Sequence, residues 1–341
     1  MCRKEDLLNT AENTEELVKP CNNRMKESIN SISPLPSMLL AIITAYCILQ
    51  FALVFPFLLW YNGAHQTYVL ANFQYDNENT KFDNTIWTYG TDYGIALFMF
   101  IGGIHCWRSA KDFYTLRFLS TSLLTCYCIS VSFGGYAHQN YLTLESLNTN
   151  SFKIVWIICV GTVTLAGGFI GAIGTELGKT LQGMNHRVKV PILPQYFWAM
   201  WGLYLTAECA RGSISFKRPA CDIFIAGTTQ TIPTFYTLLM LHSCYWKQAP
   251  STKRMGEFHM LSKLQTLVPN ALRAKITFAF LLNAPLLPLY PILLSFGLKL
   301  GSVNAILHMN LFIAWGSQYR TLYHFVKALQ EAFDFSSEKK L

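Results

Sequence analysis

The chain has 341 residues, of which 52% are hydrophobic and only 13% are charged. Soluble domains carry roughly 25% charged residues. The composition therefore excludes an ordinary soluble protein and predicts an integral membrane protein. The net charge of +8 is divided among short segments between apolar runs and forms no basic stripe. We therefore expect no nucleic acid partner.

Apolar runs recur along the chain after a polar tail at residues 1–34. Each run reaches or approaches the roughly 20 residues that a helix needs to cross the hydrocarbon core. The runs lie at residues 35–60, 88–107, 113–137, 153–174, 192–210, 221–246, 276–298 and 302–319. They predict an all-α, polytopic integral membrane helix bundle with about eight transmembrane helices in residues 35–320.

The placement of Lys and Arg gives this topology an independent test. If the N-terminus is cytosolic, eight spans return the C-terminus to the cytosol, and residues 321–341 form a second cytosolic tail. Twenty-one of the 27 basic residues then lie on the cytosolic side, some of them in the loop 247–275. The other six lie in the predicted non-cytosolic segments, one of them (Lys81) in the long loop 61–87. They are Lys81, Lys153, Arg211, Lys217, Arg218 and Lys299.

The C-terminus carries a weak targeting signal. It ends in Glu338-Lys339-Lys340-Leu341, which is similar to a dilysine retrieval signal of the endoplasmic reticulum, with the second lysine out of register. A solvated charged tail explains the same residues. We expect an integral membrane protein of the endoplasmic reticulum or another endomembrane, in contact with the lipid bilayer.

The ten cysteines are scattered, and most of them lie inside apolar runs as small packing residues. Cys209 and Cys221 differ, because they flank the same predicted non-cytosolic loop. A disulfide between them is an alternative to simple packing.

Ionisable side chains are costly inside a membrane, so each one is a candidate functional residue. Several lie toward the predicted outer face, Asp222 among them, and four of these are the candidate site: Asp92, His138, Glu208 and His308. If they converge, they can act as acids and bases, or Asp92, His138 and His308 can bind Zn²⁺ with an activated water. In the structural alternative, Asp92 and His138 lie among lipid headgroups, and Arg211 neutralises Glu208 from the next turn.

Polar and aromatic side chains accompany these four residues and are candidates for substrate binding. Tyr204 lies one helical turn before Glu208, and Asn304 and Trp315 share the helical face of His308. The first interpretation is therefore a membrane-embedded enzyme that acts on a lipid or isoprenoid-like substrate near the non-cytosolic leaflet. The chain has no GxSxG, HExxH or Walker motif that would name the reaction.

The sixth and seventh runs support a different function. Gln230 lies in a polar stretch of the sixth run, and Asn283 precedes three prolines in the seventh. Prolines break helices inside membranes, and broken helices form the binding sites of many transporters. The alternative function is thus a multi-pass transporter or channel-like carrier of a small solute or ion.

The fourth run contains glycines at helical spacing, Gly167, Gly171, Gly174 and Gly178. Small residues on one face let helix backbones approach closely. The pattern predicts a central, tightly packed helix, with a substrate-facing groove as the alternative.

Overall fold

The computed structural model describes residues 85–109, 111–147, 149–183, 188, 190–214, 229–243, 270–282, 293, 296–298 and 300–338. All of them belong to the compact unit that covers residues Phe55–Leu341. The predicted first span, at residues 35–60, lies outside the described residues.

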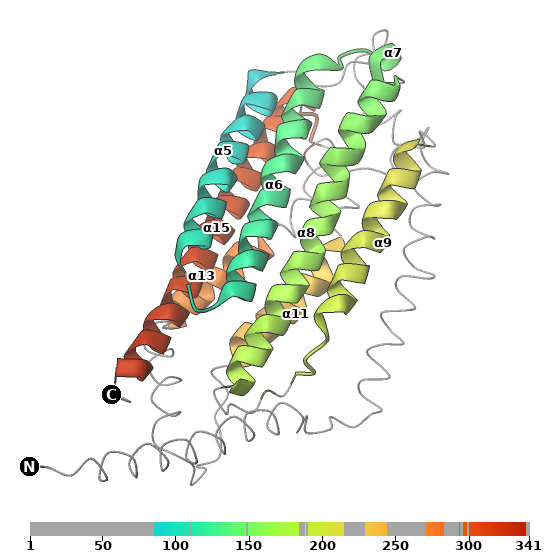
Figure 1. Ribbon diagram of the computed structural model, residues 1–341. Helices are drawn as coiled ribbons and strands as arrows, with labels where there is room; N and C mark the ends of the chain where they lie inside the picture. Colours follow the sequence, from blue (N-terminus) through green and yellow to red (C-terminus); the bar gives the residue numbers. More distant parts are fainter. Residues whose placement is uncertain are drawn as a thin grey trace, which may run out of the picture. The chain divides into compact units, whose positions relative to one another are not determined.

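The described part of the chain is built from α-helices, without a β-strand. The helices are α5 (Ile86–Ser109), α6 (Tyr114–Asn140), α7 (Leu144–Leu147), α8 (Asn150–Gly183), α9 (Gln195–Ile214), α11 (Thr231–Ser243), α13 (Asn270–Leu281) and α15 (Leu300–Glu338) (Figure 1). The all-α expectation is confirmed for these residues.

The helices follow the predicted spans, with three extensions. α5, α6 and α9 match the second, third and fifth apolar runs to within a few residues, while α11 and α13 cover parts of the sixth and seventh. α8 covers the fourth run and continues past residue 174 to Gly183. α13 begins at Asn270, inside the expected loop 247–275. α15 continues to Glu338, so residues 321–338 of the expected C-terminal tail are helical. Its 39 residues correspond to about 58 Å at 1.5 Å per residue, nearly twice the ~30 Å hydrocarbon core.

Two of the described helices are both long and apolar enough to cross a membrane. They are α6, with 27 residues, and α8, with 34. α11 and α13 are described as helix over only 13 and 12 residues, fewer than the roughly 20 of a complete span. In the described part of the chain, α6 and α8 are therefore the candidate membrane-spanning helices.

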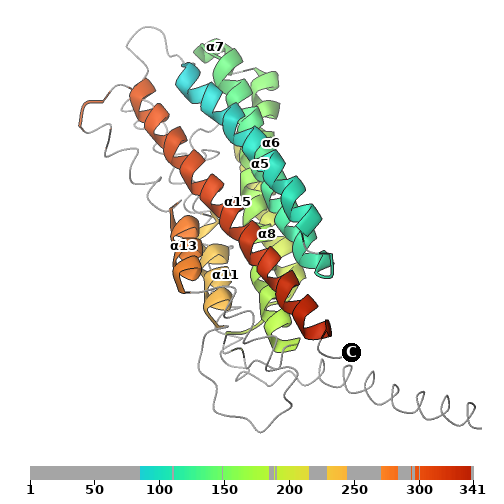
Figure 2. The same cartoon turned by 90° about the vertical axis from the view of Figure 1, so that its left-hand side faces the viewer.

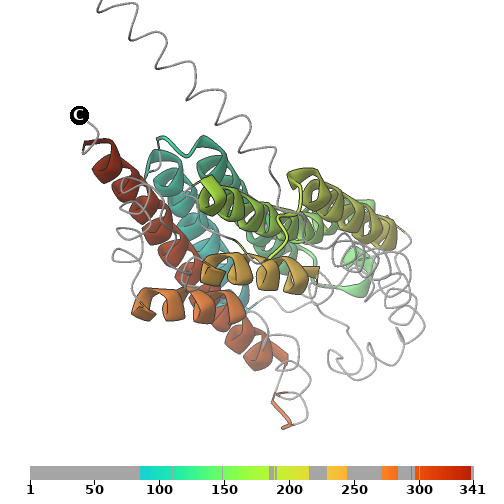
Figure 3. The ribbon, with the colours of Figure 1, turned by 90° about the horizontal axis from the view of Figure 1, so that it is seen from below.

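Contacts between neighbouring helices form a closed circuit. α5 packs on α6, α6 on α8, α8 on α11, α11 on α13, α13 on α15, and α15 returns to α5. α9 packs against α8 (Figure 1). Figure 2 shows α15 running beside α5, and Figure 3 shows α11 and α13 lying next to α15. The circuit brings α5, α6 and α15 together although α15 is far away in sequence.

Several large apolar side chains lie on the outer surface of these helices, and small polar side chains lie between the helices. Leu97 of α5 is 63% exposed, and Met200 and Leu203 of α9 are 63% and 57% exposed. Ser130 and Thr164, by contrast, are completely buried. Water would penalise such an outer surface, whereas lipid favours apolar side chains outside and hydrogen-bonded polar groups inside.

The glycines of α8 are sites of close helix packing, as the spacing predicts. A Cβ at Gly168 would lie 2.6 Å from the carbonyl oxygen of Trp198 on α9, and one at Gly171 would lie 2.1 Å from the Trp198 ring. A Cβ at Gly174 would lie 2.6 Å from Oγ1 of Thr237 on α11. These positions are filled by neighbouring helices, which favours the packed helix over the groove.

We expect Gly168→Ala to destabilise the protein by about 1–3 kcal/mol, because the new methyl group meets the backbone of α9, which cannot move by a side-chain rotation. Gly183→Ala is the matched control on the same helix, since a Cβ there has no neighbour within 4 Å. Thermal unfolding in detergent, followed by tryptophan fluorescence, compares the two. Equal melting temperatures would contradict the close packing of α8 on α9.

Candidate functional site

Asp92 is a carboxylate held inside the helix bundle. It lies on α5, six residues after the first residue of that helix, and is only 3% exposed. Its Oδ1 atom lies 3.0 Å from Nδ1 of His308 on α15. A buried carboxylate is stable only with a partner, and this imidazole lies at hydrogen-bond distance from it.

The surroundings of His308 fix which of its ring nitrogens carries the proton. Nδ1 lies 3.0 Å from Oδ1 of Asp92 and 3.2 Å from the backbone carbonyl oxygen of Thr88, one turn earlier on α5. A carbonyl oxygen only accepts hydrogen bonds, and so does an ionised carboxylate. Nδ1 is therefore the donor in these contacts, and it carries the proton of the neutral ring.

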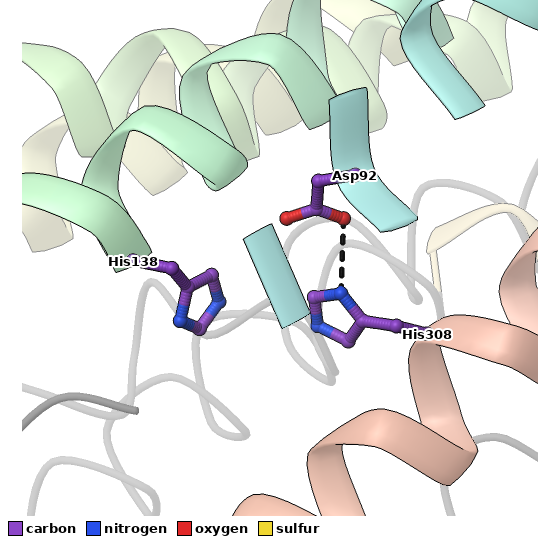
Figure 4. Close-up of side chains that lie close together, drawn as sticks. All are labelled: Asp92, His138 and His308. Atoms are coloured by element: carbon purple, nitrogen blue, oxygen red, sulfur yellow. Dashed lines mark ion pairs between the residues drawn. The ribbon is translucent and has the colours of Figure 1, made fainter. Parts of the chain in front are cut away.

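His138 completes a three-residue cluster with Asp92 and His308. It lies in the last turn of α6, is 9% exposed, and its ring centroid is 5.3 Å from that of His308, with the two planes at 77°. Each of the three residues offers one potential ligand atom within 4.8 Å of the other two. Figure 4 shows the three side chains pointing toward a common space.

Two glycines of α6 make room for the Asp92 side chain. A Cβ at Gly135 would lie 3.1 Å from Cβ of Asp92, and one at Gly134 would lie 3.3 Å from its Oδ2. Larger residues would push α5 away from α6 and move the carboxylate. The Gly134-Gly135 pair lies one turn before His138. This glycine pair could have indicated from the sequence that another helix packs closely beside His138.

Glu208 and Tyr204 are not brought to this cluster. Both lie on α9, which packs against α8. Glu208 accepts hydrogen bonds from Arg211 at 2.6 Å to Nη2 and 3.2 Å to Nε. Glu208 thus follows the structural alternative described above, in which Arg211 neutralises its charge.

Gln230 and Trp315 are linked through Tyr127, a residue that sequence reasoning missed. Trp315 stacks on the buried Tyr127 ring with centroids 3.9 Å apart and planes at 10°. The Tyr127 hydroxyl donates to Oε1 of Gln230 at 3.1 Å, and Nε2 of Gln230 donates to the Val163 carbonyl at 2.8 Å. Both ends of the Gln230 amide are therefore engaged within the protein, which favours a structural role for Gln230.

The remaining candidates are only partly described. Asn304 lies on α15, one turn before His308, and is half-buried. Asn283 and Cys221 lie outside the described residues, so the broken seventh helix and the Cys209–Cys221 disulfide stay predictions.

Comparison of the chain with protein-family models, with curated proteins and with solved structures gives no match. The chemistry of the Asp92–His138–His308 cluster is thus the basis for assigning a function.

We expect a thermodynamic coupling between Asp92 and His308 of about 1–3 kcal/mol, the range of hydrogen bonds to charged groups. The unfolding free energies of Asp92→Ala, His308→Ala and the double variant are measured by detergent titration in the presence of a metal chelator. Single effects that add to within about 0.5 kcal/mol would show that the two side chains do not interact.

Proposed function

We propose that the protein is a membrane-embedded enzyme that acts on a lipid or isoprenoid-like substrate at the Asp92–His138–His308 cluster. The observation that carries this proposal is the convergence of two imidazoles and a buried carboxylate from three helices, at ligand-atom separations of at most 4.8 Å. Such groups are expensive to bury and are retained where they do chemistry. Acid–base and metal-assisted catalysis both use this set.

The proposed membrane arrangement has eight spans, with both termini in the cytosol and residues 35–320 in the bilayer. The apolar outer surfaces of α5 and α9 and the excess of basic residues in the predicted cytosolic segments support it. The cluster lies at the start of α5, the end of α6 and the start of α15. In this arrangement that end is near the non-cytosolic leaflet of the endoplasmic reticulum or another endomembrane.

The alternative of a transporter or channel-like carrier gains no specific support. It rests on Gln230 and Asn283, and the Gln230 amide is engaged by Tyr127 and Val163. An ion path also needs polar groups strung through the bilayer, whereas the three clustered residues lie near one end of their helices.

Glycosylation mapping tests the sidedness. Gln74→Thr creates an acceptor site at Asn72 in the loop 61–87, and Arg24→Ser creates one at Asn22 in the N-terminal tail. We expect only the first variant to gain a glycan in endoplasmic reticulum membranes, seen as a shift on a gel that a glycosidase reverses. A glycan at Asn22 and none at Asn72 would invert the proposed topology.

Lipid turnover tests the enzyme. The full-length protein is incubated in nanodiscs made with a total membrane lipid extract, and untargeted mass spectrometry follows all lipids over time. We expect at least one lipid to be consumed by the wild type and by His324→Ala, with turnover at least 100-fold slower for His308→Ala. His324 is the matched control, because it is an exposed histidine on the same helix. Identical lipid profiles for the wild type and His308→Ala, with zinc and with chelator, would refute an enzyme at this site.

A further inference from the structure

We propose that Asp92, His138 and His308 bind one Zn²⁺ ion. A catalytic role for this ion rests on the proposed function. Zn²⁺ in catalytic sites commonly takes three ligands from histidine and carboxylate side chains and keeps a fourth position for water. Two imidazoles and one carboxylate supply such a set.

The separations in the cluster suit a single ion. Because the three ligand atoms lie within 4.8 Å of one another, some point lies within about 2.8 Å of all of them, and Zn²⁺ binds nitrogen and oxygen at about 2.0–2.2 Å. Each side chain therefore has to move by less than about 1 Å, which a change of a side-chain torsion provides. No rearrangement of α5, α6 or α15 is needed.

Nδ1 of His308 and Oδ1 of Asp92 are the pair of atoms that can share one ion. They lie 3.0 Å apart, close to the roughly 3.3 Å between two ligand atoms of a tetrahedral Zn²⁺ ion. The ion takes the place of the proton on Nδ1, which gives up its contact with the Thr88 carbonyl oxygen at 3.2 Å, and the neutral imidazole then carries its proton on Nε2. A ring nitrogen of His138 is the third ligand.

Burial and charge favour zinc over the other metals that use this donor set. Fe²⁺ also binds two histidines and a carboxylate, but it keeps several open positions for further ligands. Here Asp92 is 3% and His138 9% exposed, so the cluster has room for few additional ligands, and four-coordinate Zn²⁺ fits best. The ion also compensates the negative charge of a carboxylate that is removed from water.

A zinc ion at this place would supply hydrolytic chemistry, which suits a lipid with an ester or amide linkage. Zn²⁺ does no redox chemistry, and it lowers the pKa of its bound water to about 7. The bound hydroxide adds to the carbonyl carbon, the C–O or C–N bond breaks, and the leaving alcohol or amine takes up the proton that the water released. One water is consumed per bond. The cluster lies near the helix ends, at the depth where the ~30 Å hydrocarbon core gives way to the headgroup region and lipid linkages lie.

Metal content tests the zinc site without any substrate. The full-length protein is purified in detergent, and bound metals are measured by inductively coupled plasma mass spectrometry. We expect about one zinc per chain in the wild type and in His324→Ala, and at least tenfold less in His308→Ala, His138→Ala and Asp92→Ala. Cobalt added to the zinc-depleted wild type should give the visible absorption bands of a tetrahedral site, which His308→Ala lacks.

A variant with a different zinc ligand distinguishes the loss of a ligand from the loss of the fold. Cysteine is a strong zinc ligand, so His308→Cys should retain zinc where His308→Ala does not, with both variants eluting as the wild type in size exclusion. A wild-type protein without zinc and without the cobalt bands overturns the proposal, as does iron in place of zinc or equal zinc in wild type and His308→Ala. Lipid turnover without zinc overturns the zinc site alone, and bound zinc without turnover overturns the enzyme alone.

Discussion

The contact between Asp92 and His308 is the interaction on which the site depends. It joins the N-terminal parts of α5 and α15 through a 3.0 Å hydrogen bond, between two residues that are more than 200 positions apart in sequence. A carboxylate that is 3% exposed is tolerated inside an apolar bundle only because it has this partner. The same bond orients the His308 ring, whose centroid lies 5.3 Å from that of His138.

Close helix packing makes this contact possible. Gly134 and Gly135 of α6 leave space for the Asp92 side chain, and Gly102 of α5 lies against the Tyr319 ring of α15, where a Cβ would come within 2.6 Å of that ring. On the other side of the circuit, the glycines of α8 let α9 and α11 approach. Small residues thus allow these helices to approach closely.

The sequence was sufficient to place most of the described helices and part of the site. Apolar runs located the helices, and sorting ionisable residues by membrane side selected Asp92, His138 and His308, which the structure brings together. It could not separate Glu208 from them, because depth along a helix carries no information on which helices are neighbours. The Arg211 contact was the available hint. Tyr127 was missed since a single tyrosine in an apolar run has no periodic signal, and the helical end of α15 was missed because its polar residues resemble a tail.

The most direct test of the three-residue centre is zinc K-edge X-ray absorption of the purified wild-type protein, which reports the atoms around the ion and their distances. Ligation by Asp92, His138 and His308 predicts about four nitrogen and oxygen neighbours at ~2.0–2.2 Å, with the outer-shell scattering of two imidazoles. Sulfur neighbours at about 2.3 Å would place the ion at cysteines, and an absent zinc edge would remove the metal from the site; either result would contradict this centre.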